Sequence, residues 1–478
     1  MKKHLLIIYM LLLIGVPSVS LGQSLPIIYK NPTNGLVNKI RYNNSTGKHI
    51  MYSFPYGENH FALTDISNTA INAKIASGQY VINDFEIFED YVIFCGRTYS
   101  SEGMIGWFHI DDLFMAGVPA KFDPTLDVLG IASLENIEVY RDDKKNIHIA
   151  GYGVGYSGTT TIYKGFEAVG PTLTNMKYRV ETFPDEVCDL TVTDNYVAYV
   201  GPFSSIVFGS FGVMLYMFPK NDMFYNTYFS TAYYQTAYHY PSTDPGWWSV
   251  LYIQEPLYPS KLKITHVDKD TVATLSYKLR RDPYPPVPPS TVIPATISHD
   301  MVLRTYDLST LASGNPVVMH SAYDMIFNGF PSLDMYAFEY DPMQKTYSVF
   351  QQLSYPSTPA DNVVTQIDFQ SGVPSWIPNY YWTYPNLPLS GFCLSGSPYY
   401  TVCGYDPISY ATYFWQDQYT STPTNCINKE MLPFSSIAVE DEKMDIYPST
   451  ATGWVPLNYV LGAPIAKVED YSCILCKN

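Results

Sequence analysis

Short apolar runs separated by tight polar turns recur along the chain. In three places an acidic residue is followed by an apolar run, a turn of Asp, Asn or Lys, a second apolar run, and then a small residue and Gly. These copies span 86–96, 138–151 and 189–201, and a shorter echo stands at 399–404. Two β-rich runs joined by such turn residues are typical of a β-hairpin. The pattern therefore predicts hairpins at these positions.

A further apolar run begins about ten residues after the Gly in three of the copies, at 106–110, 160–163 and 212–216. The spacing from Gly96 to Gly151 is 55 residues and from Gly151 to Gly201 is 50, close to the ~40–50 residues of a propeller blade. The inner runs are apolar on both faces. A strand packed between two neighbouring sheets requires that, whereas a sheet with one wet face does not.

Less regular units follow the first three. They are 263–267 with 271–277 and 301–306, then 335–340 with 346–350, then 363–367 and the final stretch 436–471, and an early unit lies near 49–66. The number of repeat units is seven or eight, and one of them is a candidate seam in which both ends of the chain share a blade. We expect an all-β fold, a β-propeller with seven blades, with six or eight as alternatives and several β-sandwich domains as the other architecture.

These repeats resemble those of β-propeller proteins in general. The chain lacks the Gly-His and Trp-Asp pair, the Gly-Gly doublet of Kelch repeats and the Ser-x-Asp-x-Gly box. The resemblance implies a fold with ligands met at one end of a central channel, and it transfers no functional residue.

Composition agrees with an all-β chain. The 478 residues include 44 Tyr, 24 Phe and 7 Trp, so 16% are aromatic, while only 15% are charged. Aromatic side chains favour pleated, half-buried surfaces, and long helices need more Glu, Lys and Ala. A disordered chain and a coiled coil are excluded.

The first residues have the features of a signal peptide. Lys2 and Lys3 precede an apolar run, and small residues at 20–22 precede Gln23. The alternative is a membrane anchor, but the run has about 12 residues where a span needs ~20. We expect a signal peptide at 1–22, a single domain at 23–478, and export to the bacterial periplasm or cell exterior, with no transmembrane segment.

The net charge argues against a nucleic-acid partner. It is −16 for the full chain and becomes −18 once Lys2 and Lys3 are removed, and outside the signal no run of Lys and Arg exceeds two. A protein that neutralises phosphates needs a basic face.

Cysteine spacing points to packing rather than chemistry. Cys95 and Cys403 occupy the small position before the recurrent Gly, so we expect them to be buried thiols. Cys473 and Cys476 have a CxxC spacing, but too little chain follows for a redox helix and no second pair supports zinc. A terminal disulfide or free thiols are the expectation there.

No motif for a cofactor, a metal or a catalytic nucleophile is present. The sequence at 153–158 fits GxGxxG, but a strand pattern follows where the dinucleotide fingerprint needs a helix. His148 and His266 fall inside expected strands, and no HExxH spacing occurs. Asp84 with Glu86, or Asp189 with Asp194, could be paired carboxylates for glycoside chemistry.

Two expected insertions, at about 221–260 and 281–299, interrupt the repeats. The first is rich in aromatic rings, a second ring cluster lies at 376–384, and the Pro-rich second insertion reads as a stiff loop. Clustered rings with polar edges stack on sugars or anchor protein partners, although they could equally pack the insertions onto the fold. The candidate ligand-binding residues are Trp247, Trp248, Trp376, Tyr381 and Trp382.

The sequence thus favours an exported, non-catalytic binding or scaffold protein with a glycan or a partner protein as ligand. The alternatives are a propeller glycoside hydrolase or lyase with carboxylates at the channel mouth, and a purely structural envelope protein.

Overall fold

The structure is a computed structural model. It describes residues 27–475 except for 32–36, 55–58, 65–69, 76–79, 115–118, 124–125, 127–128, 206–209, 221–227, 236–261, 282–296, 311, 314–316, 321–331, 355–360, 369–374, 382–388, 406–411, 419–426, 430–433, 437–441, 449–451 and 469–471. The described residues form an all-β protein of antiparallel sheets with one short 3₁₀ helix, Ile110–Phe114. In this part of the chain, no helix has the length and apolar character needed to cross a membrane.

Of the 35 described strands, 28 fall into seven units of four, and within the first six units the ladder order follows the chain order. The first three units are β2 (Val37–Asn43), β3 (Lys48–Ser53), β4 (Asn59–Thr64) and β5 (Ala70–Ile75); β6 (Tyr80–Phe88), β7 (Tyr91–Thr98), β8 (Gly103–His109) and β9 (Pro119–Asp123); and β10 (Ser133–Arg141), β11 (Ile147–Ser157), β12 (Thr160–Thr172) and β13 (Asn175–Thr182).

The next three units continue the same order. They are β14 (Asp189–Val192), β15 (Tyr196–Ser205), β16 (Ser210–Pro219) and β17 (Tyr228–Gln235); β18 (Leu262–Asp268), β19 (Thr271–Arg281), β20 (Ile297–Asp307) and β22 (Val317–His320), with β21 (Ala312–Ser313) beside β20; and β23 (Ser332–Asp341), β24 (Thr346–Ser354), β25 (Asp361–Asp368) and β26 (Ser375–Tyr381).

The seventh unit joins the two ends of the chain. It contains β27 (Leu389–Leu394), β28 (Tyr399–Tyr405), β29 (Thr412–Gln418) and the N-terminal strand β1 (Ile27–Asn31), followed by the C-terminal strand β35 (Ser472–Leu475). β1 pairs with β29 on one side and with β35 on the other, both antiparallel. The expected seam, in which both ends of the chain share one sheet, is therefore present.

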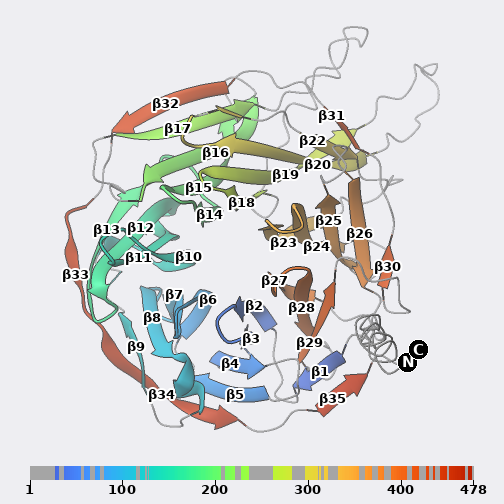
Figure 1. Cartoon of the computed structure of the whole chain (residues 1–478). Helices are drawn as coiled ribbons and strands as arrows, with labels where there is room; N and C mark the ends of the chain where they lie inside the picture. Colours follow the sequence, from blue (N-terminus) through green and yellow to red (C-terminus); the bar gives the residue numbers. More distant parts are fainter. Residues whose placement is uncertain are drawn as a thin grey trace, which may run out of the picture.

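The units are arranged around a common centre, with the first strand of each unit innermost (Figure 1). Each innermost strand contacts the next, in the order β2, β6, β10, β14, β18, β23 and β27, and β27 contacts β2. The first and seventh units also meet through a buried side-chain contact, in which the Thr401 hydroxyl lies 2.8 Å from Nε2 of His49. Burial lowers the pKa of His49 to about 4, so the imidazole is neutral at neutral pH.

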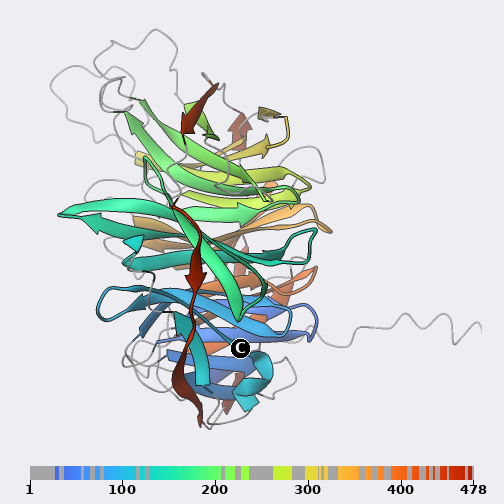
Figure 2. The ribbon, with the colours of Figure 1, turned by 90° about the vertical axis from the view of Figure 1, so that its left-hand side faces the viewer.

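After β29 the chain runs back around the outside. Its strands are β30 (Ile427–Lys429), β31 (Phe434–Ser436), β32 (Glu442–Pro448), β33 (Val455–Leu457), β34 (Val460–Val468) and β35. They pair in turn with β26, β22, β17, β13, then β9 and β5 together, and finally β1. We call Ile427–Leu475 the C-terminal belt. Figure 2 shows β33 and β34, in dark red, crossing the outer edges of the blue and green sheets.

The belt corrects one expectation from the sequence. The stretch 436–471 was expected to form a unit of its own, but its strands each add to a different sheet. Three of these strands carry proline, namely Pro448 of β32, Pro456 of β33 and Pro464 of β34. Because proline cannot donate a ladder hydrogen bond, such strands suit an outer edge and not the interior of a sheet.

The expected hairpins are confirmed where the pattern was clearest. β6 with β7, β10 with β11, and β14 with β15 form antiparallel pairs, and each is followed by its third strand. The echo at 399–404 is the single strand β28. The GxGxxG stretch ends β11 and turns into β12 at Gly158, which has φ +64°, so no helix begins there.

The core lies between neighbouring units. One cluster packs Ile93 and Trp107 of the second unit against Leu134 and Phe166 of the third. Cys95 and Cys403 are fully buried free thiols, as expected, and burial raises the pKa of each. Because both faces of the second strand of a unit contact apolar side chains, apolar and polar residues do not alternate along it.

The recurrent Gly permits a close approach of the innermost strand. The pairing of β6 with β7 shifts register between Ile82 and Asp84, opposite Gly96. A Cβ atom at Gly96 would lie 2.0 Å from the carbonyl oxygen of Val81. Any side chain at this position would push the bulged strand away.

We predict that Gly96→Ala lowers the free energy of unfolding by about 1–3 kcal/mol, because the new methyl group overlaps backbone atoms that cannot rotate aside. Urea denaturation followed by fluorescence measures the change. Arg97→Ala, at the exposed neighbouring position, is the control and should change stability by less than about 0.5 kcal/mol. Equal stability of Gly96→Ala and wild type would contradict the close approach.

Candidate functional site

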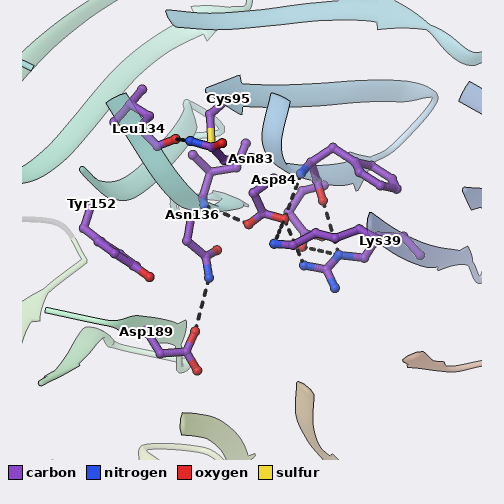
Figure 3. Close-up of polar contacts among 12 residues, drawn as sticks. Lys39, Asn83, Asp84, Cys95, Leu134, Asn136, Tyr152 and Asp189 are labelled. Atoms are coloured by element: carbon purple, nitrogen blue, oxygen red, sulfur yellow. Dashed lines mark hydrogen bonds and ion pairs between the residues drawn. The ribbon is translucent and has the colours of Figure 1, made fainter. Parts of the chain in front are cut away.

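Charged side chains of the innermost strands meet near the centre of the molecule. We call this set the central charge cluster. Its members are Lys39 and Arg41 of β2, Asp84 and Glu86 of β6, Glu138 of β10, Asp189 of β14, Lys263 of β18 and Glu339 of β23. Figure 3 shows the part around Lys39, Asp84, Asn136 and Asp189. The cluster holds five acids and three bases, so it keeps the acidic character of the whole chain.

Asp84 binds three units together. Its carboxylate is fully buried and accepts hydrogen bonds from the backbone N–H of Phe85 at 2.8 Å and of Ile137 at 3.2 Å. It also pairs with the Lys39 ammonium and, at 3.4 Å, with Nη2 of Arg41. A buried carboxylate is tolerated only when its oxygens are bonded and its charge is balanced. Asp84 meets both conditions by bonding to β2 and β10.

Two other acids bond to the following unit in the same way. Asp189 accepts the N–H of Ile264 at 3.0 Å, and Glu339 accepts the N–H of Leu394 at 2.8 Å. Asp189 also accepts a hydrogen bond from the Asn136 amide at 3.1 Å. These carboxylates therefore act as connections between innermost strands, which leaves them poorly placed to act on a ligand.

Arg41 lies among four carboxylates. Its Nε donates to Glu86 at 2.7 Å and to the carbonyl oxygen of Phe85 at 3.2 Å. Burial alone would lower the pKa of Arg41, but the charges of Glu86, Asp84, Glu339 and Glu138 raise it. The guanidinium is a permanent cation that holds these acids near one another.

Several acids of the cluster bind protons more readily than usual. Burial raises the pKa of Glu86 to about 7, against the opposing charge of Arg41. Burial raises the pKa of Glu138 well above its usual value and also raises the pKa of Asp189 and Glu339. Glu138 is within electrostatic range of Glu86 and Asp84. A carboxylic acid that is protonated near neutral pH can donate a hydrogen bond or a proton.

The structure offers no metal centre in its described part. There, no group of three or more His, Cys, Asp or Glu side chains is arranged to hold a metal ion. His148 lies in β11 between two acids, with Nδ1 3.2 Å from Glu167 and Nε2 3.2 Å from Asp142. His266 lies in β18 at the surface, with Nε2 3.0 Å from the carbonyl oxygen of Lys269. Both are hydrogen-bonded strand residues, as expected.

The structure describes two of the five aromatic residues chosen from the sequence. Trp376 and Tyr381 both belong to β26, where they pair with Ile367 of β25 and Ile427 of β30. Trp247, Trp248 and Trp382 lie outside the described residues.

The two expected insertions are described only in part. Within 221–260 the structure describes strand β17, which is paired with β16 and β32. Of 281–299, residue 281 ends β19 and 297–299 begin β20, while 282–296 are outside the described residues.

The two carboxylate pairs named from the sequence have different outcomes. Asp84 and Glu86 lie together in the central charge cluster and both contact Arg41. Asp189 and Asp194 do not form a pair, because Asp194 is in the exposed turn after β14 and its N–H bonds to Lys269. Sequence reasoning missed Lys39, Arg41, Glu138 and Glu339, whose only local signal is a charged residue inside an apolar strand.

Sequence reasoning also missed two exposed rings. Tyr99 is 58% exposed and follows β7, and Tyr156 is 61% exposed near the end of β11. Both lie beside the turn from the second to the third strand of a unit. The segment before β10 links the two turns, since the Ile131 carbonyl accepts the N–H of Gly103 and the N–H of Ala132 bonds to Val154. Tyr99 and Tyr156 therefore lie at the same end of the molecule.

Comparison with known proteins adds no family: the chain shows no significant match to any family model or to any curated protein.

We predict that Asp84→Asn lowers the free energy of unfolding by about 3–5 kcal/mol, because the amide leaves Lys39 and Arg41 beside a buried neutral group. Chemical denaturation measures the loss. Asp90→Asn, in the exposed turn after β6, is the matched control and should behave like wild type. A small loss in Asp84→Asn would show that the cluster does not hold the units together.

The raised pKa of Glu86 predicts a pH dependence of stability. The folded state keeps the proton up to about pH 7, whereas the unfolded chain releases it near pH 4.5. The stabilisation from Glu86 is therefore complete below pH 4.5 and is lost as the pH rises toward 7. We expect the stability of wild type relative to Glu86→Gln to fall over this range in urea titrations. A relative stability that rises with pH would indicate that Arg41 keeps Glu86 ionised.

Proposed function

We propose that the seven units form a closed seven-bladed β-propeller. The contacts around the centre support this, since each innermost strand touches the next and β27 touches β2. The seventh unit supports it further, because it takes its fourth strand from the N-terminus.

The proposed function is that of an exported, non-catalytic binding or scaffold protein whose ligand is an extracellular glycan or a partner protein. The observation that carries it is that the central carboxylates are used in bonds between units, whereas two tyrosine rings are exposed. Asp84, Asp189 and Glu339 are occupied by backbone N–H groups of neighbouring units. Tyr99 and Tyr156 are instead free of the core and exposed at one end.

Exposed tyrosines suit the proposed ligands. A tyrosine ring offers an apolar face for stacking and a hydroxyl for hydrogen bonding, and it loses little conformational entropy when it is bound. The export signal expected at 1–22 would bring this surface to extracellular glycans and proteins. The ring-rich residues Trp247, Trp248 and Trp382 remain candidates for the same surface.

The test is retention on a panel of immobilised polysaccharides and on proteins captured from the cell envelope. We expect the double variant Tyr99→Ala, Tyr156→Ala to bind about tenfold more weakly, a loss of about 1.4 kcal/mol. Tyr399→Ala is the matched control. Tyr399 is also partly exposed, but it follows the turn between the first and second strands of its unit. Absence of binding by the wild type, or equal binding by the double variant, would overturn the proposal.

A second candidate is a glycoside hydrolase or lyase. The specific observation in its favour is the raised pKa of Glu86 and Glu138 beside the carboxylate of Asp84. A glycosidase needs one protonated and one ionised carboxyl group. Release of new sugar ends from the same polysaccharides, abolished by Glu138→Gln, would favour this enzyme over the binding protein.

A further inference from the structure

The C-terminal belt is attached to the units at their outer edges. β33 pairs with β13 through three residues, Val455 to Leu457, and one of them is Pro456. β34 pairs with β9 and then with β5, so a single strand bridges the first two units. In the described structure, β33 is the last strand of its sheet, whereas β34 lies between the outer strands β5 and β9 of two units. Neither strand lies between two strands of the same unit. Either strand can therefore leave without breaking any ladder between the four strands of a unit.

The belt adds little to the core where its side chains are described. Within 452–462 only Leu457 is buried, at 4% exposure. Trp454, Val460 and Leu461 are exposed. The buried residues of the neighbouring units come from their own strands, as with Ile93 and Phe166. Loss of the belt here would remove Leu457 and the partly buried Val455 and Tyr459 from this cluster, whose other members belong to the units.

A few specific contacts hold this part of the belt down. The N–H of Asn458 donates to Asp123 at 2.9 Å, and the ring of Tyr459 lies 4.4 Å from that of Trp107. Gly462 crosses directly over Phe122. A Cβ atom at Gly462 would lie only 1.7 Å from the ring of this core phenylalanine. The close approach of β34 to β9 therefore requires glycine at this position.

We propose that the belt is a strap that can detach from the outer edges of the units while the units stay folded. β33 and β34 are held by ladders of three or four residue pairs and by a small number of side-chain contacts, and β32 is held by a ladder of seven pairs with β17. Each unit has its own ladders and core. Detachment uncovers the outer edges of β9, β13 and β17.

Hydrogen exchange of the full chain, read by mass spectrometry, tests the strap. In the wild type we expect peptides from 442–468 to exchange at least about tenfold faster than peptides from β7, β11 and β15. Gly462→Ala should speed exchange of the belt by a further factor of about ten and leave β7, β11 and β15 unchanged. The matched control is Gly453→Ala, since a Cβ there meets nothing within 4 Å.

Two outcomes would overturn the strap. One is exchange of belt and inner strands at the same rate in the wild type, which would mean that the belt opens only when the whole protein unfolds. The other is a Gly462→Ala protein that fails to fold or exchanges faster throughout, since the units would then depend on the belt. Tyr459→Ala, which removes the ring contact with Trp107, provides a second variant with the same readout.

Discussion

Every unit of this protein has two strand edges whose backbone groups need partners, and the structure satisfies the inner and outer edges differently. At the centre, an innermost strand has no further strand to pair with. Its N–H groups at Ile137, Ile264 and Leu394 are instead bonded by carboxylates of the preceding unit. At the perimeter, the belt supplies an extra strand. Because unpaired buried N–H groups cost free energy, the contacts between neighbouring units depend on the bonds at the centre, whereas the belt covers an edge that is already the end of each unit.

The bonding at the centre explains why charged side chains are concentrated there. An acid that bonds to a backbone N–H is stable in the interior only with a cation nearby, and Lys39 and Arg41 supply that charge to Asp84. Glu86 and Glu138 are then placed in the same field, and burial raises their pKa values. Much of the central charge is thus a consequence of joining the strands, and the exposed rings lie elsewhere.

The sequence predicted the parts of this fold that are local. A hairpin and its Gly are encoded within about a dozen residues, so the pairs around Gly96, Gly151 and Gly201 could be found. The belt could not, because each of its strands pairs with a unit far away in the chain and has no repeat of its own. Its prolines were the available signal. Only part of the central charge cluster could be predicted, for the same reason. Asp84 and Glu86 are close in sequence, whereas Arg41 belongs to the neighbouring unit and contacts them only in the folded protein.

The position of β1 has a consequence for the order of events during synthesis. It is the first described strand to be made, yet its two partners, β29 and β35, lie near the other end of the chain. It can find neither until almost the entire protein has been translated. The early units can form their local hairpins meanwhile, while β1 must wait as an unpaired apolar segment. Such distant pairing is slow and leaves strands open to wrong partners. β1 therefore stays unpaired until β29 and β35 have both been made.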